Sequence, residues 1–150
     1  MKFERILVAV EFSSHDRATV EMAVSLAAPL SASLTVFHAF EPQTFLHSMV
    51  PGTDSALDEE SVRTMSEGLL ATIREGLLGR GVADVRTVAC AGYPQKALLG
   101  FAMEGKFDLV VMGMHGKSGW GRLWTGSVSE AVVGRMACPV VLVPSSSHHP

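Results

Sequence analysis

Short hydrophobic runs alternate along this chain with longer stretches in which apolar residues recur at helical spacing. The runs at 6–10, 34–39, 108–112 and 140–143 are almost continuously apolar, as expected of strands buried on both faces of a sheet. The run at 85–90 is more polar, which an edge strand tolerates. Strands that alternate with helices predict a doubly wound α/β fold, with a parallel sheet covered on both faces.

Four amphipathic segments provide the predicted helices. The first follows a plausible capping sequence at 13–16, the second is closed by Gly79 and Gly81, and the third begins at Pro94. Their apolar positions are Ala18, Met22, Ala23, Leu26 and Ala27; Val62, Met65, Leu69, Ile73 and Leu77; Ala97, Leu98, Phe101 and Ala102; and Val128, Ala131, Val132 and Met136. We expect one domain over 1–144, with a surface loop at 41–55 and a flexible tail at 145–150.

Composition narrows the classes of function. The chain has 150 residues, of which 47% are hydrophobic, and a net charge of -3. Such a chain buries a core without disulfides, and its charge favours neither nucleic acid nor an anionic membrane as partner. Cys90 and Cys138 have no metal or redox spacing, so we interpret them as small core residues in a reduced setting. The run at 6–10 is too short for a signal peptide or a membrane span, and we expect a cytoplasmic protein.

The glycine-rich segment at 113–129 carries the candidate chemistry. It lies between a predicted buried strand and a predicted helix, where backbone N–H groups and the positive helix end favour an anion. A Walker A motif would need glycine in place of Val111, and a G-x-G-x-x-G fingerprint does not fit 119–124. The spacing that fits is G-x2-G-x9-G-S, formed by Gly113, Gly116, Gly126 and Ser127.

This spacing is that of the nucleotide motif of the universal stress protein family, which the chain resembles from about residue 3 to residue 144. The resemblance extends to Glu11-Phe12-Ser13, to His38-Ala39, to Gly92-Tyr93-Pro94 and to the segment at 138–143. It implies a five-stranded parallel sheet of order 3-2-1-4-5, which is Rossmann-like and similar to adenine nucleotide alpha hydrolases. It also implies ATP as cofactor, with or without Mg²⁺, and a homodimer formed through the strand at 140–143.

The resemblance also assigns the binding residues, position by position. The family's base and ribose contacts would fall on Val10, Glu11, Ala39 and Met112. Its phosphate contacts would fall on Gly113, Gly116, Gly126, Ser127, Val128 and Ser129, and His115 lies in the same loop. The departure is Glu11, because nucleotide-binding members usually carry Asp there. A lost hydrogen bond to a charged group is worth about 1.5–3 kcal/mol, or roughly ten- to hundredfold in affinity, so we expect weakened binding.

Three functions stay open at this point. The first is an ATP-binding stress-response module that senses or signals through nucleotide occupancy and dimer contacts. The second is a slow ATP hydrolase, which would need a base or a metal-holding carboxylate beside the phosphates. The segment at 113–129 contains no Asp or Glu, so we assign no catalytic and no metal-binding residue. The third is a dimeric interaction protein that binds no nucleotide.

Several side chains near the motif have a structural interpretation beside the functional one. Lys117 and Arg122 are either phosphate contacts or solvated loop charges, and His115 is as well explained by stabilisation of the turn. Trp120 and Trp124 either cover a nucleotide or pack on the domain or a partner subunit, and we favour packing. His38 is expected to be a strand-end residue with a hydrogen-bond partner and not a ligand.

Overall fold

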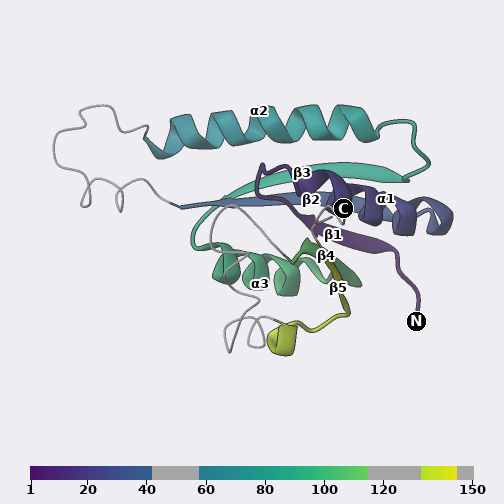
Figure 1. Cartoon of the computed structure of the whole chain (residues 1–150). Helices are drawn as coiled ribbons and strands as arrows, with labels where there is room; N and C mark the ends of the chain where they lie inside the picture. The colour runs from purple at the N-terminus through teal and green to yellow at the C-terminus, as the bar shows by residue number, and fades with distance from the viewer. Residues whose placement is uncertain (42–57, 115–132, 145–150) are drawn as a thin grey trace, which may run out of the picture.

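The structure is a computed structural model that describes residues 1–41, 58–114 and 133–144. Strands and helices alternate as the sequence predicts, and Figure 1 shows α2 above the sheet and α3 below it. In chain order the elements are β1 (Arg5–Ala9), α1 (Asp16–Leu30), β2 (Ser33–Phe40), α2 (Glu59–Leu77), β3 (Asp84–Ala91), α3 (Pro94–Gly105), β4 (Leu109–Gly113) and β5 (Val140–Val143). Most of the fourth predicted helix lies outside the described residues. The described residues 133–135 of this segment are helical.

All five strands form one parallel sheet of order β3-β2-β1-β4-β5, which confirms the predicted fold class. Val8 of β1 pairs with Val36 of β2 on one side and with Val111 of β4 on the other. The chain therefore moves outward from β1 in one direction through β2 and β3, and then in the other through β4 and β5. The boundary between β1 and β4 is the switch point, where doubly wound sheets bind ligands beyond the carboxyl ends of the strands.

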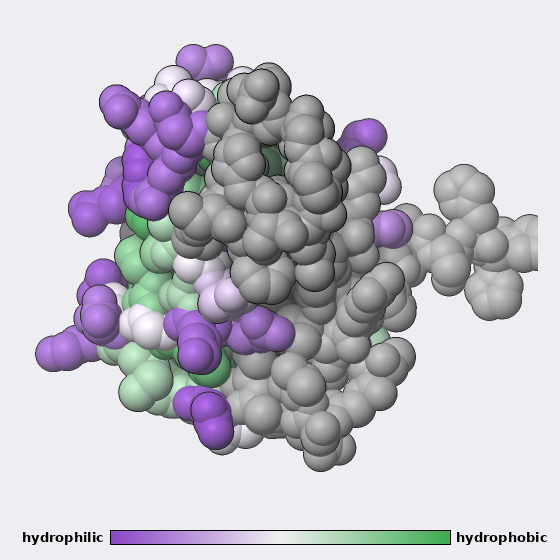
Figure 2. Space-filling view, turned by 90° about the vertical axis from the view of Figure 1, so that its left-hand side faces the viewer, coloured by the Kyte–Doolittle hydropathy of each residue, from purple (hydrophilic) through white to green (hydrophobic). Residues whose placement is uncertain are grey.

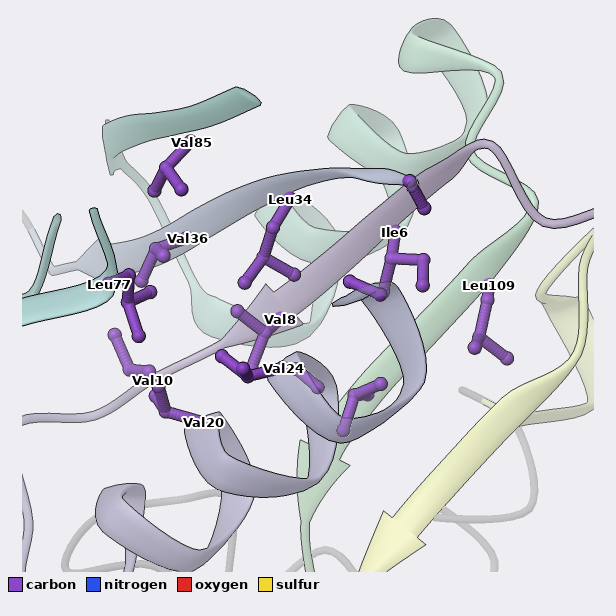
Figure 3. Packing of buried hydrophobic residues seen from close by; sticks show 14 of the residues in the cluster. Ile6, Val8, Val10, Val20, Val24, Leu34, Val36, Leu77, Val85 and Leu109 are labelled. Atoms are coloured by element: carbon purple, nitrogen blue, oxygen red, sulfur yellow. The ribbon is translucent and has the colours of Figure 1, made fainter. Parts of the chain in front are cut away.

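The two faces of the sheet bury separate hydrophobic clusters, because successive strand residues point to opposite faces. One cluster joins alternate residues of the central strands, such as Ile6, Val8 and Leu34, to α1 and α2 (Figure 3). The other joins the intervening residues, such as Leu7 and Phe37, to α3. Packing on both faces of the central strands thus positions their carboxyl ends.

The buried face of α2 differs from the predicted one. Leu70 and Leu77 are buried as core residues, but the side chains of Met65 and Leu69 are 56% and 49% exposed. The face of α2 that packs on β2 and β3 therefore includes Leu70 and Leu77 but not Met65. Leu69 lines a groove of about 420 Å³ between α1 and α2, which Phe12 and residues of both helices also line. On the face seen in Figure 2, hydrophilic side chains lie at the top of the molecule, the end where α2 lies, and again lower down, with hydrophobic side chains between them.

The edge strand β3 is covered by two arginines of α2. Arg63 Nη1 donates a hydrogen bond to the carbonyl oxygen of Ala89 at 3.0 Å, and Arg74 Nε donates one to that of Val85 at 2.9 Å. Unpaired carbonyls on an edge strand can template pairing with another chain. The arginines satisfy two of these carbonyls within the same molecule.

The opposite, amino-terminal end of the sheet is tied by a carboxylate. Asp108 Oδ2, just before β4, accepts hydrogen bonds from the backbone N–H groups of Glu4 and Arg5, both at 2.8 Å. The start of β1 is therefore fixed to the start of β4. Within the described ranges, no helix has the length and hydropathy needed to cross a membrane.

Candidate functional site

Five of the predicted binding residues come together at the carboxyl ends of three neighbouring strands. Val10 and Glu11 follow β1, Ala39 lies near the end of β2, and Met112 and Gly113 end β4. The backbone N–H of Val10 donates to the carbonyl oxygen of Phe37 at 2.9 Å, so β1 stays beside β2 to this point. The residues assigned to base and ribose are thus placed at the switch point of the sheet.

A small recess opens between these strand ends and the start of α1. Its volume is about 10 Å³, the space of about one water molecule. Pockets that enclose a whole small ligand are usually about 300–1,000 Å³, so the recess by itself is too small to enclose one. The described residues that line it are Ala9, Glu11, His15, Asp16, Thr19, Met112 and Gly113.

The remaining predicted contacts, which the resemblance assigns to the phosphates, lie outside the described residues. These are His115, Gly116, Gly126, Ser127, Val128 and Ser129. Gly113 is the one glycine of the motif that the structure describes, and it lies at the end of β4 on the wall of the recess. The described part of the candidate site therefore consists of the residues that the resemblance assigns to base and ribose, together with Gly113.

Asp16 organises the turn between β1 and α1. Its carboxylate accepts the backbone N–H of Glu11 at 3.0 Å on Oδ1 and 3.2 Å on Oδ2, and that of Ser13 at 3.0 Å on Oδ2. The sequence predicted a helix cap at 13–16, but the residue at the cap position is His15, whose side chain makes no capping bond. The Asp16 side chain serves the preceding turn and not the helix N–H groups, a role that the sequence analysis missed.

His38 holds the same turn from the side of β2. Its Nδ1 lies 2.8 Å from the carbonyl oxygen of Val10, and because a carbonyl only accepts, Nδ1 carries the proton. The ring of Phe12, a residue with a positive φ of 59°, lies on the imidazole at a centroid distance of 4.0 Å. Burial lowers the pKa of His38, an effect that the bond to Val10 and the charge of Asp16 oppose. The expectation of a strand-end histidine with a structural partner is therefore confirmed.

The chemistry of the recess suits hydrogen-bond donors. Two carboxylates, Glu11 and Asp16, line it, and the lining residues that the structure describes include neither lysine nor arginine. Ionised carboxylates only accept hydrogen bonds, so hydroxyl and amino groups are favoured there and phosphates are repelled. This end of the site matches a sugar or a base better than a phosphate chain.

The described residues offer no ready-made metal centre. Across 1–41, 58–114 and 133–144, no three or more His, Cys, Asp or Glu residues are grouped so that they could hold a metal ion. Glu11 and Asp16 alone do not complete such a set. Of the described residues that line the recess, these two carboxylates are the acidic groups that Mg²⁺ could meet, and phosphates and water commonly complete the coordination of this ion.

Comparisons with known proteins agree with this geometry. The family model described as "Universal stress protein family" matches residues 2–144. A universal stress protein of Thermus aquaticus is 33% identical over 142 residues, which cover 94% of this chain and 98% of the relative. The structure is similar in fold to the universal stress protein UspA of Lactobacillus plantarum, with a TM-score of 0.75, 19% identity and coverage of 95% and 99%.

A second solved structure carries information on a ligand. It is a universal stress protein in complex with cAMP, with a TM-score of 0.72 and 25% sequence identity to this chain. The match covers 97% of this chain and 100% of the other.

Proposed function

The chain belongs to the universal stress protein family, and on that premise we propose that it binds an adenine nucleotide at the boundary between β1 and β4. The observation that carries this proposal is the convergence of Glu11, Ala39 and Gly113 at the carboxyl ends of three strands. The complex of a related protein with cAMP supports the class of ligand.

The two halves of the site take different parts of the nucleotide in this proposal. Val10, Glu11, Ala39 and Met112 would contact base and ribose. Glu11 and Met112 line the recess and give it a carboxylate and a buried apolar side chain. Val10 and Ala39 lie at the ends of the neighbouring strands, outside the lining of the recess. The glycine-rich segment, with Gly113, His115, Gly116, Gly126, Ser127, Val128 and Ser129, takes the phosphates of ATP. Its backbone amides suit an anion that the carboxylates of the recess would repel.

The proposed role is nucleotide sensing and not turnover. The glycine-rich segment at 113–129, to which this proposal assigns the phosphates, contains no Asp or Glu that could act as a general base beside them. Nucleotide occupancy would instead be read by partners or by the second subunit of a homodimer formed through β5. Antiparallel pairing of two β5 strands across a two-fold axis is the form that such a dimer would take.

Titration with adenine nucleotides tests the proposal. Both tryptophans of the chain, Trp120 and Trp124, lie in the glycine-rich segment, so their fluorescence should change on binding. The melting temperature should rise too, because ligand at 100 times Kd stabilises by about 2.7 kcal/mol. ATP, ADP, AMP and cAMP are compared, with GTP as the control for the base. If millimolar concentrations of all four adenine nucleotides move neither readout, the proposal is wrong.

Phosphate release, measured in the same samples, separates sensing from hydrolysis. We expect a binding shift without phosphate release over hours. Release that depends on the protein and on Mg²⁺ would favour the slow hydrolase. Sedimentation velocity with and without nucleotide then tests the dimer, and a monomer at all concentrations would contradict it.

A further inference from the structure

We propose that Asp16 is a positioning residue of the nucleotide site, which sets the direction in which Glu11 enters the recess; this inference rests on the proposed function. Asp16 is the first residue of α1, and its side chain turns back toward the end of β1. It accepts the N–H groups of Glu11 and Ser13, and it also lines the recess that Glu11 lines.

The turn needs a group that fixes its backbone, because one of its residues has an unusual backbone conformation. Phe12 has a φ of 59°, in the left-handed region that residues with a side chain seldom adopt. A conformation of this kind persists only where the surroundings determine it. Here the N–H groups on either side of Phe12, those of Glu11 and Ser13, share one acceptor, the carboxylate of Asp16.

The other backbone group of the turn is held from the opposite side. His38 donates to the carbonyl oxygen of Val10, while Asp16 accepts the N–H of Glu11. These two groups belong to the same peptide bond, so one peptide plane is fixed at both its oxygen and its nitrogen. The Cα of Glu11 is attached to that plane, and the starting direction of its side chain is thereby set.

Position matters more for Glu11 than it would for a shorter acid. A glutamate side chain has one more rotatable bond than aspartate and loses more rotamer freedom when it is fixed. A backbone anchored by Asp16 limits where the carboxylate can reach. Without the anchor, the turn can relax away from the strained φ of Phe12 and carry the Glu11 carboxylate out of the recess.

The test compares two substitutions at Asp16 with one elsewhere. Asp16→Ala removes the acceptor, and Asp16→Asn keeps one oxygen but places an amide donor near an N–H group. Asp58→Ala is the matched control. Asp58 is the N-cap residue of α2, so it lies at a helix start as Asp16 does, and its side chain also accepts a backbone N–H, that of Ser61 at 2.7 Å. Asp58 does not line the recess.

We expect AMP affinity, measured by calorimetry, to fall about tenfold or more in Asp16→Ala, which corresponds to about 1.4 kcal/mol. Asp16→Asn should lie between this variant and the unsubstituted protein. Asp58→Ala should bind within about twofold of the unsubstituted protein, although its helix cap is lost. Equal binding by Asp16→Ala and the unsubstituted protein would overturn the proposal. An equal loss in Asp58→Ala would do so too, because the effect would then follow stability alone.

A second measurement needs no ligand. Amide hydrogen exchange at Glu11 and Ser13, followed by NMR, should be faster in Asp16→Ala and unchanged in Asp58→Ala. If the unsubstituted protein binds no nucleotide, the proposed function fails, and this measurement still decides whether Asp16 holds the turn. Unchanged exchange at both amides in Asp16→Ala would refute its positioning role.

Discussion

Shortening Glu11 to aspartate tests whether the reach of this carboxylate determines the affinity for a nucleotide. Glu11→Asp removes one methylene from a side chain that lines a recess of only about 10 Å³, and so enlarges the space available to a sugar hydroxyl. The backbone should not move, because Asp16 holds the N–H of Glu11 and His38 holds the preceding carbonyl. The charge is kept, so only the reach of the carboxylate changes.

The size of the effect follows from the bond that is gained. A hydrogen bond to a charged group contributes about 1.5–3 kcal/mol, which corresponds to roughly ten- to hundredfold in affinity. Glu11 is only half-buried, and a second carboxylate lies beside it, so we expect the lower end, about tenfold tighter binding. Tighter binding is expected because aspartate is the residue usual at this position in nucleotide-binding members of the family.

Calorimetric titration with AMP measures this effect at fixed ionic strength. AMP keeps the phosphate contribution small, so a change at the ribose end is easy to see. Glu104→Asp, an exposed position on α3, is the matched control and should leave Kd unchanged. Unchanged or weaker binding by Glu11→Asp would refute the argument that the longer acid overshoots.

Three further results are expected. Burial lowers the pKa of His38, so between pH 6.5 and the lowered pKa the unfolded chain binds more protons than the folded protein. The melting temperature should therefore fall as the pH drops from 6.5 through the lowered pKa. His38→Asn, which keeps a hydrogen-bond donor, should flatten this pH dependence. Asp108→Ala loses two hydrogen bonds to backbone N–H groups, so the free energy of unfolding, measured in urea, should fall by about 1–3 kcal/mol. A loss below about 0.5 kcal/mol would contradict the role of Asp108 in joining the starts of β1 and β4. The double substitution Arg63→Ala and Arg74→Ala frees two carbonyls on the β3 edge, so self-association, measured by light scattering at increasing protein concentration, should increase. Arg86→Ala, at an exposed arginine that bonds to Asp84, is the control and should cause no increase.

The architecture could be predicted from the sequence because the strands are short, apolar and separated by helical patterns. Continuous runs such as 108–112 identify buried strands, and the resemblance supplies the strand order. The buried face of α2 could not be predicted fully. Met65 and Leu69 continue the apolar stripe of the helix, but Met65 is exposed and Leu69 lines the groove. A helical pattern alone does not distinguish these surroundings from the core.

The candidate site residues could be named from the sequence, but the hydrogen bonds that hold the turn beside them could not. Val10, Glu11, Ala39 and Met112 came from the resemblance, and the structure brings them to one end of the sheet. The role of Asp16 was missed because an acid at a helix start is usually assigned to capping. Only the path of the chain between β1 and α1 shows that its oxygens point backward, to N–H groups that precede the helix.

The two α2 arginines that bond to the β3 edge affect how copies of this chain can assemble. A sheet extends into a filament only if each added molecule exposes an unpaired edge strand to the next one. Arg63 and Arg74 occupy two carbonyls along the β3 edge, so another strand would have to displace these bonds before it could pair there. The same helix that completes the core thereby disfavours growth of the sheet by strand addition at β3.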